Sequence, residues 1–322
     1  MTETLATYSL IAVYATMGIY TLAFIFATMD LAKRSEAIPA KTPAAVAAGS
    51  AGDSGGSVAV AEREADEPTA HHAPGSVFQK IALGLLVVGW VVHWAATIMR
   101  GIAGNRVPWA NMFEFGLTAT LLIVAVYLGS LFWRDLGYLA AYIAGFNVLA
   151  LGIVTVNFYV DVVPLPPALQ SVWLVLHVFV ASLGTAFFGL AAGLSIFQLV
   201  RARFDARAAA TPRLLATLPG TSTLESLAFR LNVIGFVFWT FTLVAGAIWA
   251  ERAWGRYWGW DVKEVWTFII WVIFAGYIHA RATRGWRGSR SAWLGLIGFG
   301  AVLFNYSVVN IAFTGLHSYS GL

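Results

Sequence analysis

Eight stretches of mostly apolar residues constrain this chain more than any other feature. A helix needs about 20 apolar residues to cross the hydrocarbon core of a bilayer. Because lipid offers no hydrogen bonds to a polypeptide backbone, each stretch is expected to be an α-helix. We therefore predict an all-α integral membrane protein with about eight transmembrane helices. The expected spans are residues 7–29, 77–98, 112–132, 136–158, 172–200, 228–249, 265–282 and 291–313.

The composition agrees with a membrane protein and excludes several chemistries. Of the 322 residues, 59% are hydrophobic and 11% are charged, whereas soluble domains have about 25% charged residues. The net charge of +4 then reflects topology, so we expect membrane lipid and not nucleic acid around the chain. Without cysteine, the chain has no disulfide, thiolate metal site or thiol nucleophile. The first apolar run is long enough to span and lacks a basic leader, so no cleavable signal peptide is expected.

The distribution of Lys and Arg between the loops predicts the orientation. Loops alternate between the two faces of the membrane, and 15 of the 20 basic residues fall on one face and 5 on the other. Since positive charge accumulates in cytoplasmic loops, the more basic face is expected to be cytoplasmic. Both termini and the loop at 254–261 are then expected on the outer face of the plasma membrane.

Residues 31–76 differ from the rest of the chain in composition. They are rich in Ala, Gly, Ser and acidic residues and contain few large apolar side chains. This composition is typical of a disordered linker. We therefore predict an N-terminal transmembrane helix at 1–30, a disordered cytoplasmic linker at 31–76 and a seven-helix core at 77–322.

Residues 254–261 read Trp-Gly-Arg-Tyr-Trp-Gly-Trp-Asp and lie where a predicted membrane helix meets water. Four aromatic rings within seven residues exceed the interfacial belts of Trp and Tyr that anchor many membrane proteins, which is the alternative interpretation. A flat aromatic platform suits a flat, apolar, partly charged ligand, for which a porphyrin is the obvious candidate. The candidate binding residues are Trp254, Gly255, Arg256, Tyr257, Trp258, Gly259 and Trp260.

Four histidines lie in or beside the predicted spans, where an ionisable group is by default a functional candidate. His177 and His317 both come close to the outer ends of their helices, and two imidazoles could hold a six-coordinate haem iron. His279 lies 13 residues past Trp266, roughly 20 Å deeper along its helix, so it could serve only a second site. For His93 a structural and a functional role stay equally open.

Together these features resemble the CcsA/ResC family of cytochrome c assembly proteins, which carries a tryptophan-rich WWD motif. As in that family, the motif at 254–261 is followed by Lys-Glu and a further tryptophan. The segment from Arg100 to Glu114 matches as well. The resemblance covers the chain from about residue 77 to its end.

The resemblance implies where haem is bound. His177 and His317 match the two outer-face histidines of the family and are expected to coordinate the haem iron. Asp261 is expected to belong to the same catalytic site and to orient the loop by accepting backbone hydrogen bonds. His279 matches the family's transmembrane histidine and is expected to hold haem within the membrane before it reaches the outer site.

The resemblance also implies the cofactor and the partners. The vinyl groups of haem b would be joined to the thiols of a Cys-x-x-Cys-His segment in an apocytochrome c. Haem lyase activity would belong to a complex with a separate ResB/Ccs1-type membrane partner, which would supply the second ligand to the haem at His279. The haem propionates would pair with Arg252, Arg256 or Lys263.

Two other functions are compatible with such a chain. A system I protein carries a related tryptophan-rich motif but delivers haem to a chaperone; the Arg-Tyr and Lys-Glu pairs around the present motif favour system II. The second alternative is a membrane transporter or a cytochrome b subunit without enzymatic activity. A cytochrome b would pair histidines from helices at matched depths, whereas here the outer pair adjoins an open loop.

Overall fold

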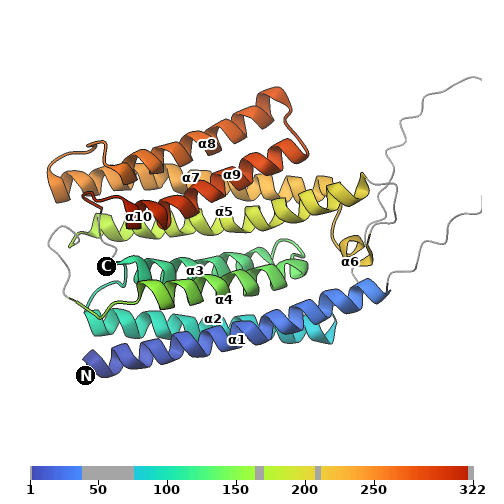
Figure 1. Cartoon of the computed structure of the whole chain (residues 1–322), viewed down its shortest axis with the longest axis horizontal. Helices are drawn as coiled ribbons and strands as arrows, with labels where there is room; N and C mark the ends of the chain where they lie inside the picture. The colour runs from blue at the N-terminus through green and yellow to red at the C-terminus, as the bar shows by residue number, and fades with distance from the viewer. Residues whose placement is uncertain (1, 38–75, 164–169, 207–211, 318–322) are drawn as a thin grey trace, which may run out of the picture.

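The described part of the chain is built from helices joined by loops (Figure 1). The structure is a computed structural model and describes residues 2–37, 76–163, 170–206 and 212–317. Within these ranges, eight helices are long and apolar enough to cross a membrane, which confirms the predicted all-α, multi-pass membrane fold. The elements are α1 (Thr2–Ala37), α2 (Val77–Gly104), α3 (Met112–Ser130), η1 (Gly137–Leu139), α4 (Ala140–Phe158), α5 (Val172–Asp205), α6 (Arg213–Ala216), α7 (Thr221–Trp254), α8 (Val262–Arg284), α9 (Ser289–Tyr306) and α10 (Val308–Ala312).

The long helices run side by side as a bundle (Figure 1). Helix α1 packs along α2 and also contacts α4, α5 packs along α7, and α9 contacts both α5 and α8. The start of α1, the connections from α2 to α3 and from α7 to α8, and the end of α10 all lie at one end of the bundle (Figure 1). The loop at 254–261 is therefore at the same end as the beginning of α5 and the end of α10.

Helix α1 continues to Ala37 instead of ending at residue 30, where the linker was expected to begin. Two contacts of Asp30 lie at this end of the helix. Asp30 forms an ion pair with Arg34 one turn later (2.9 Å), and it accepts a hydrogen bond of 2.5 Å from the hydroxyl of Ser76, just before α2. The remainder of the expected linker, residues 38–75, lies outside the described residues.

His93 of α2 is fully buried and has partners for both of its ring nitrogens. Nε2 lies 2.9 Å from the carbonyl oxygen of Leu117 in α3, and Nδ1 lies 3.4 Å from the hydroxyl of Tyr20 in α1. Nε2 donates to the carbonyl, so Nδ1 is the acceptor for the tyrosine hydroxyl. Because both nitrogens are used within the protein, the structure favours the structural role for this histidine.

A buried charge cluster holds the loop between α2 and α3. Glu114 pairs with the Nε of Arg100 at 3.1 Å and with Arg106 at 2.5 Å, and it accepts from the backbone N–H of Ala110 at 2.9 Å. Arg100 also donates to the carbonyl of Val160, in the connection between α4 and α5, at 2.6 Å. The cluster therefore ties together two loops at the end of the bundle that carries the tryptophan motif.

Candidate functional site

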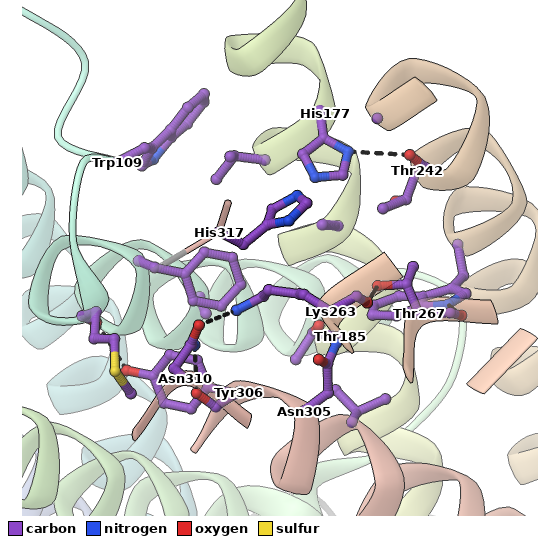
Figure 2. A pocket seen from close by; sticks show the side chains of 18 of the residues that line it. Trp109, His177, Thr185, Thr242, Lys263, Thr267, Asn305, Tyr306, Asn310 and His317 are labelled. Carbon is purple, nitrogen blue, oxygen red and sulfur yellow. Dashed lines mark hydrogen bonds between the residues drawn. The ribbon is translucent and has the colours of Figure 1, made fainter. Parts of the chain in front are cut away.

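A cavity of about 250 Å³ lies inside this end of the bundle. Residues of α3, α4, α5, α7, α8, α9 and α10 line it, together with the loop before α8 and the segment after α10. Its walls are mostly apolar, and polar side chains are placed among them (Figure 2). The polar lining residues are Asn111, Thr120, His177, Thr185, Thr242, Tyr257, Lys263, Glu264, Thr267, Asn305, Tyr306, Asn310 and His317.

His177 faces the cavity from the second turn of α5. Its Nδ1 lies 3.0 Å from the backbone carbonyl oxygen of Thr242 in α7 and therefore carries the proton and donates (Figure 2). Its ring stacks on Trp249, with centroids 5.9 Å apart and planes 18° apart. Nε2 has no hydrogen-bond partner among the described residues, so its lone pair is available to a ligand in the cavity.

His317 follows α10 and lines the same cavity, with its ring below that of His177 in Figure 2. Its ring packs edge-on against Trp254 and Trp249, with centroid distances of 4.8 and 5.4 Å. Its Nδ1 lies 3.5 Å from the carboxylate of Asp261. Among the described residues, Nε2 of His317 has no hydrogen-bond partner, as was found for Nε2 of His177. Trp249 contacts both imidazole rings.

Asp261 is fixed by the start of α8, for which it is the N-cap. It accepts hydrogen bonds of 3.0 Å from the backbone N–H groups of Lys263 and Leu316. The interaction with His317, followed by these backbone hydrogen bonds, lowers the pKa of Asp261 to about 2 in spite of partial burial. The carboxylate is therefore ionised at neutral pH and lies beside the His317 ring.

The loop at 254–261 is shaped by one glycine and one glutamate. Helix α7 ends at Gly255, whose φ of 71° lies in the left-handed region that glycine adopts without strain. Glu264 completes a capping box with Asp261 and accepts from the backbone N–H groups of Gly259 (2.8 Å) and Asp261 (3.0 Å). Arg256 pairs with the same carboxylate at 3.6 Å and lies beside Gly259.

The four aromatic rings of the loop do not form the single flat platform expected from the sequence. Trp254 turns inward against His317, whereas Tyr257 and Trp258 line the cavity. Trp260, 76% exposed, has a φ of 59° and crosses Trp258 at 85° outside the cavity lining. Gly255 and Trp260 both have left-handed backbone conformations, which turn the chain direction within the loop. The aromatic rings of the loop therefore face different directions.

Three basic residues near the motif were expected to pair with the haem propionates, and their surroundings differ. Arg252 is exposed and does not line the cavity, and Arg256 is engaged with Glu264. Lys263 lines the cavity and donates a hydrogen bond to the amide oxygen of Asn310 (Figure 2).

His279 is exposed on the surface of α8 and does not line the cavity. The structure therefore brings His177, His317 and Asp261 together and leaves His279 apart from them. The sequence analysis did not single out Trp249, although its ring contacts both cavity histidines. The six residues before it on α7, 243–248, have no polar side chain, so the local sequence carries no signal for this position.

Comparison with known proteins supplies the family. Residues 109–317, which include the motif and the three histidines at 177, 279 and 317, match the family described as "Cytochrome C assembly protein". The chain belongs to the cytochrome c assembly protein family. The relatives described next confirm the expected resemblance to CcsA-type proteins.

Individual members of the cytochrome c assembly family are similar over most of the chain. The cytochrome c biogenesis protein CcsA of Guillardia theta is 35% identical over 273 residues, which cover 77% of this chain and 90% of that protein. The CcsA protein of Synechococcus elongatus is 34% identical over 272 residues, covering 68% and 81%. Among solved structures, the fold is similar to "Cytochrome c Heme Lyase CcmF", with a TM-score of 0.62 and 16% identity over 94% of this chain and 46% of that one.

Proposed function

We propose that this protein holds haem between His177 and His317 and presents it for covalent attachment to an apocytochrome c. As a member of the cytochrome c assembly family, it is a haem-handling subunit of cytochrome c maturation. The proposal rests on one observation above all: Nδ1 of His177 donates to a protein carbonyl, Nδ1 of His317 lies 3.5 Å from a carboxylate, and Nε2 of each is left available. Metal-bound histidines in proteins are typically held in this way.

The surroundings of the two imidazoles fit a haem. The walls are mostly apolar and aromatic, as a porphyrin ring requires, and Tyr257 and Trp258 border the cavity beside the histidines. Two neutral imidazoles give a six-coordinate haem iron.

The chemistry of attachment leaves positioning to this chain. Each thioether forms when a thiol S–H of the apocytochrome adds across a vinyl group of haem b, and the present chain has no cysteine of its own. Its residues therefore fix the ring and exclude water. One of the two imidazoles must leave when the histidine of the Cys-x-x-Cys-His segment binds the iron. His317 is the better leaving ligand, because it lies on a non-helical segment while His177 is fixed in α5.

His279 would serve a second haem position, deeper in the membrane, and a ResB/Ccs1-type partner would supply the other ligand. The exposure of this histidine on α8 supports the proposal, because a ligand from another chain needs access. On this assignment haem moves from the cytoplasmic side toward the outer face, where the tryptophan motif lies. We expect His279→Ala to lower the haem content of the complex with its partner. Unchanged haem content would contradict the second site.

The function is tested by the reduced absorption spectrum of the protein purified in detergent with its partner. We expect a six-coordinate haem b spectrum from the native complex. His177→Ala combined with His317→Ala should remove or alter the haem at the outer site, whereas elution as a single monodisperse species should be retained. Absence of haem from the native complex, when haem is plentiful in the cells, would contradict the proposed function.

A small residue opposite His177 provides a second test. A Cβ atom added at Gly246 of α7 would lie 2.8 Å from the His177 ring, so Gly246→Ala should push the ring away from the Thr242 carbonyl. Since loss of an orienting partner weakens metal binding about 10- to 100-fold, haem retention should fall by a similar factor. The matched control is Gly276→Ala in α8, where the added carbon meets no atom within 4 Å. Equal haem retention in the two variants would contradict the proposal that His177 is a haem ligand.

A further inference from the structure

We propose that Lys263 is the counter-ion for a haem propionate and thereby sets which edge of the haem faces the incoming thiols. The inference rests on the proposed function and adds a positioning residue to it. It starts from a lysine amine that points into the cavity lined by both histidines (Figure 2).

The amine of Lys263 has a single neutral acceptor in the protein. It donates to the amide oxygen of Asn310, whose own N–H₂ group donates to the carbonyl of Tyr306 at 2.6 Å. This second hydrogen bond fixes the amide, so its oxygen must face the lysine. An ammonium group has three N–H donors, and no other acceptor within the described ranges bonds to it. Two donors therefore remain for a ligand.

The carboxylates next to Lys263 in the sequence are engaged elsewhere. Asp261 faces His317 and the backbone N–H of Leu316. Glu264 is used by the tryptophan loop and by Arg256. Among the described residues no carboxylate lies within 4 Å of the lysine amine. A positive charge facing mostly apolar walls is unfavourable without an anion, so the ligand is the natural source of that anion.

Haem b carries its two propionates on one edge and its two vinyl groups on the other side of the ring. Two imidazoles alone fix the iron but leave the ring free to rotate about the axis that joins them. A carboxylate held at Lys263 removes this freedom and directs the vinyl groups away from the lysine. Arg256 is engaged with Glu264 and Arg252 lies outside the cavity lining, so neither competes for this role.

The test compares haem with haem dimethyl ester, which has the same ring and iron but no free carboxylate. Haem-depleted complex is titrated with each compound and binding is followed by absorption. We expect wild-type protein to bind haem about 10- to 100-fold more tightly than the ester, as for a charge-assisted hydrogen bond. Lys263→Met should bind both compounds equally, with an unchanged six-coordinate spectrum, and Lys263→Arg should keep part of the preference. The control, Lys80→Met, exchanges an exposed lysine near the start of α2, at the opposite end of the bundle, and should keep the full preference.

The outcomes separate this inference from the proposed function. If wild-type protein binds neither compound, the proposed function fails. If it binds both equally, or if Lys263→Met still prefers haem over the ester, haem binding stands and the role of the lysine is wrong. A third arm adds oleate, a fatty-acid carboxylate. Displacement of haem by oleate in the wild type but not in Lys263→Met would assign the lysine to a lipid and overturn the inference.

Discussion

Replacing Glu114 with glutamine should destabilise the protein by about 3–5 kcal/mol, the cost of removing one partner from a buried ion pair. The side chains of Glu114 and Arg100 are each 1% exposed, and that of Arg106 is 7% exposed. Both guanidinium groups would lose their only carboxylate within 4 Å among the described residues. The measurement is the midpoint of thermal unfolding in detergent, supported by the yield of monodisperse protein.

The control for Glu114→Gln is an ion pair at the surface. Asp205 pairs with Arg201 at 3.4 Å, and the aspartate side chain is 42% exposed. Exposed ion pairs contribute about 0–1 kcal/mol to the free energy of unfolding, so Asp205→Asn should change the midpoint of thermal unfolding little. If both variants unfolded at the same temperature, the charge cluster would not be what holds the two loops together.

Replacing Asp261 with alanine should lower haem affinity about 10- to 100-fold, as loss of a carboxylate that orients a metal-bound histidine does. The substitution removes the group that faces His317 at 3.5 Å and the acceptor for the backbone N–H groups of Lys263 and Leu316. Asp261→Asn should lower haem affinity less than Asp261→Ala does, because an asparagine oxygen still accepts those backbone hydrogen bonds. Haem retained per complex after size-exclusion chromatography is the quantity to compare.

A second helix cap separates the effect on haem from the effect on helix stability. Ser76 is the N-cap of α2 and accepts from the backbone N–H of Gln79 at 3.2 Å. Loss of either cap should destabilise the protein by about 1 kcal/mol, and Ser76→Ala also removes the hydrogen bond that the hydroxyl donates to Asp30. Only Asp261→Ala should release haem; a similar loss of haem from Ser76→Ala would show that Asp261 acts through stability alone.

The sequence by itself determined the membrane-spanning architecture. Bilayer thickness fixes how long an apolar run must be, so the eight helices could be predicted from the sequence. The predicted helix ends differed from the observed ones by several residues. Helices α1, α5 and α7 are longer than the apolar runs within them, because each helix continues through polar residues at its ends. The alternation of spans also placed the motif at the same end of the bundle as His177 and His317, since each crossing reverses the direction of the chain.

Only the tertiary structure decided how the site is arranged. The carbonyl of Thr242 that holds His177 is 65 residues away in sequence, and the inward turn of Trp254 depends on contact with His317. The choice of Lys263 over Arg256 likewise follows from where Glu264 and Asn310 lie. A membrane helix is apolar on nearly all sides, so its sequence lacks the amphipathic pattern that reveals an inward face in a soluble helix. Which side chains meet in the cavity is therefore set by packing between helices.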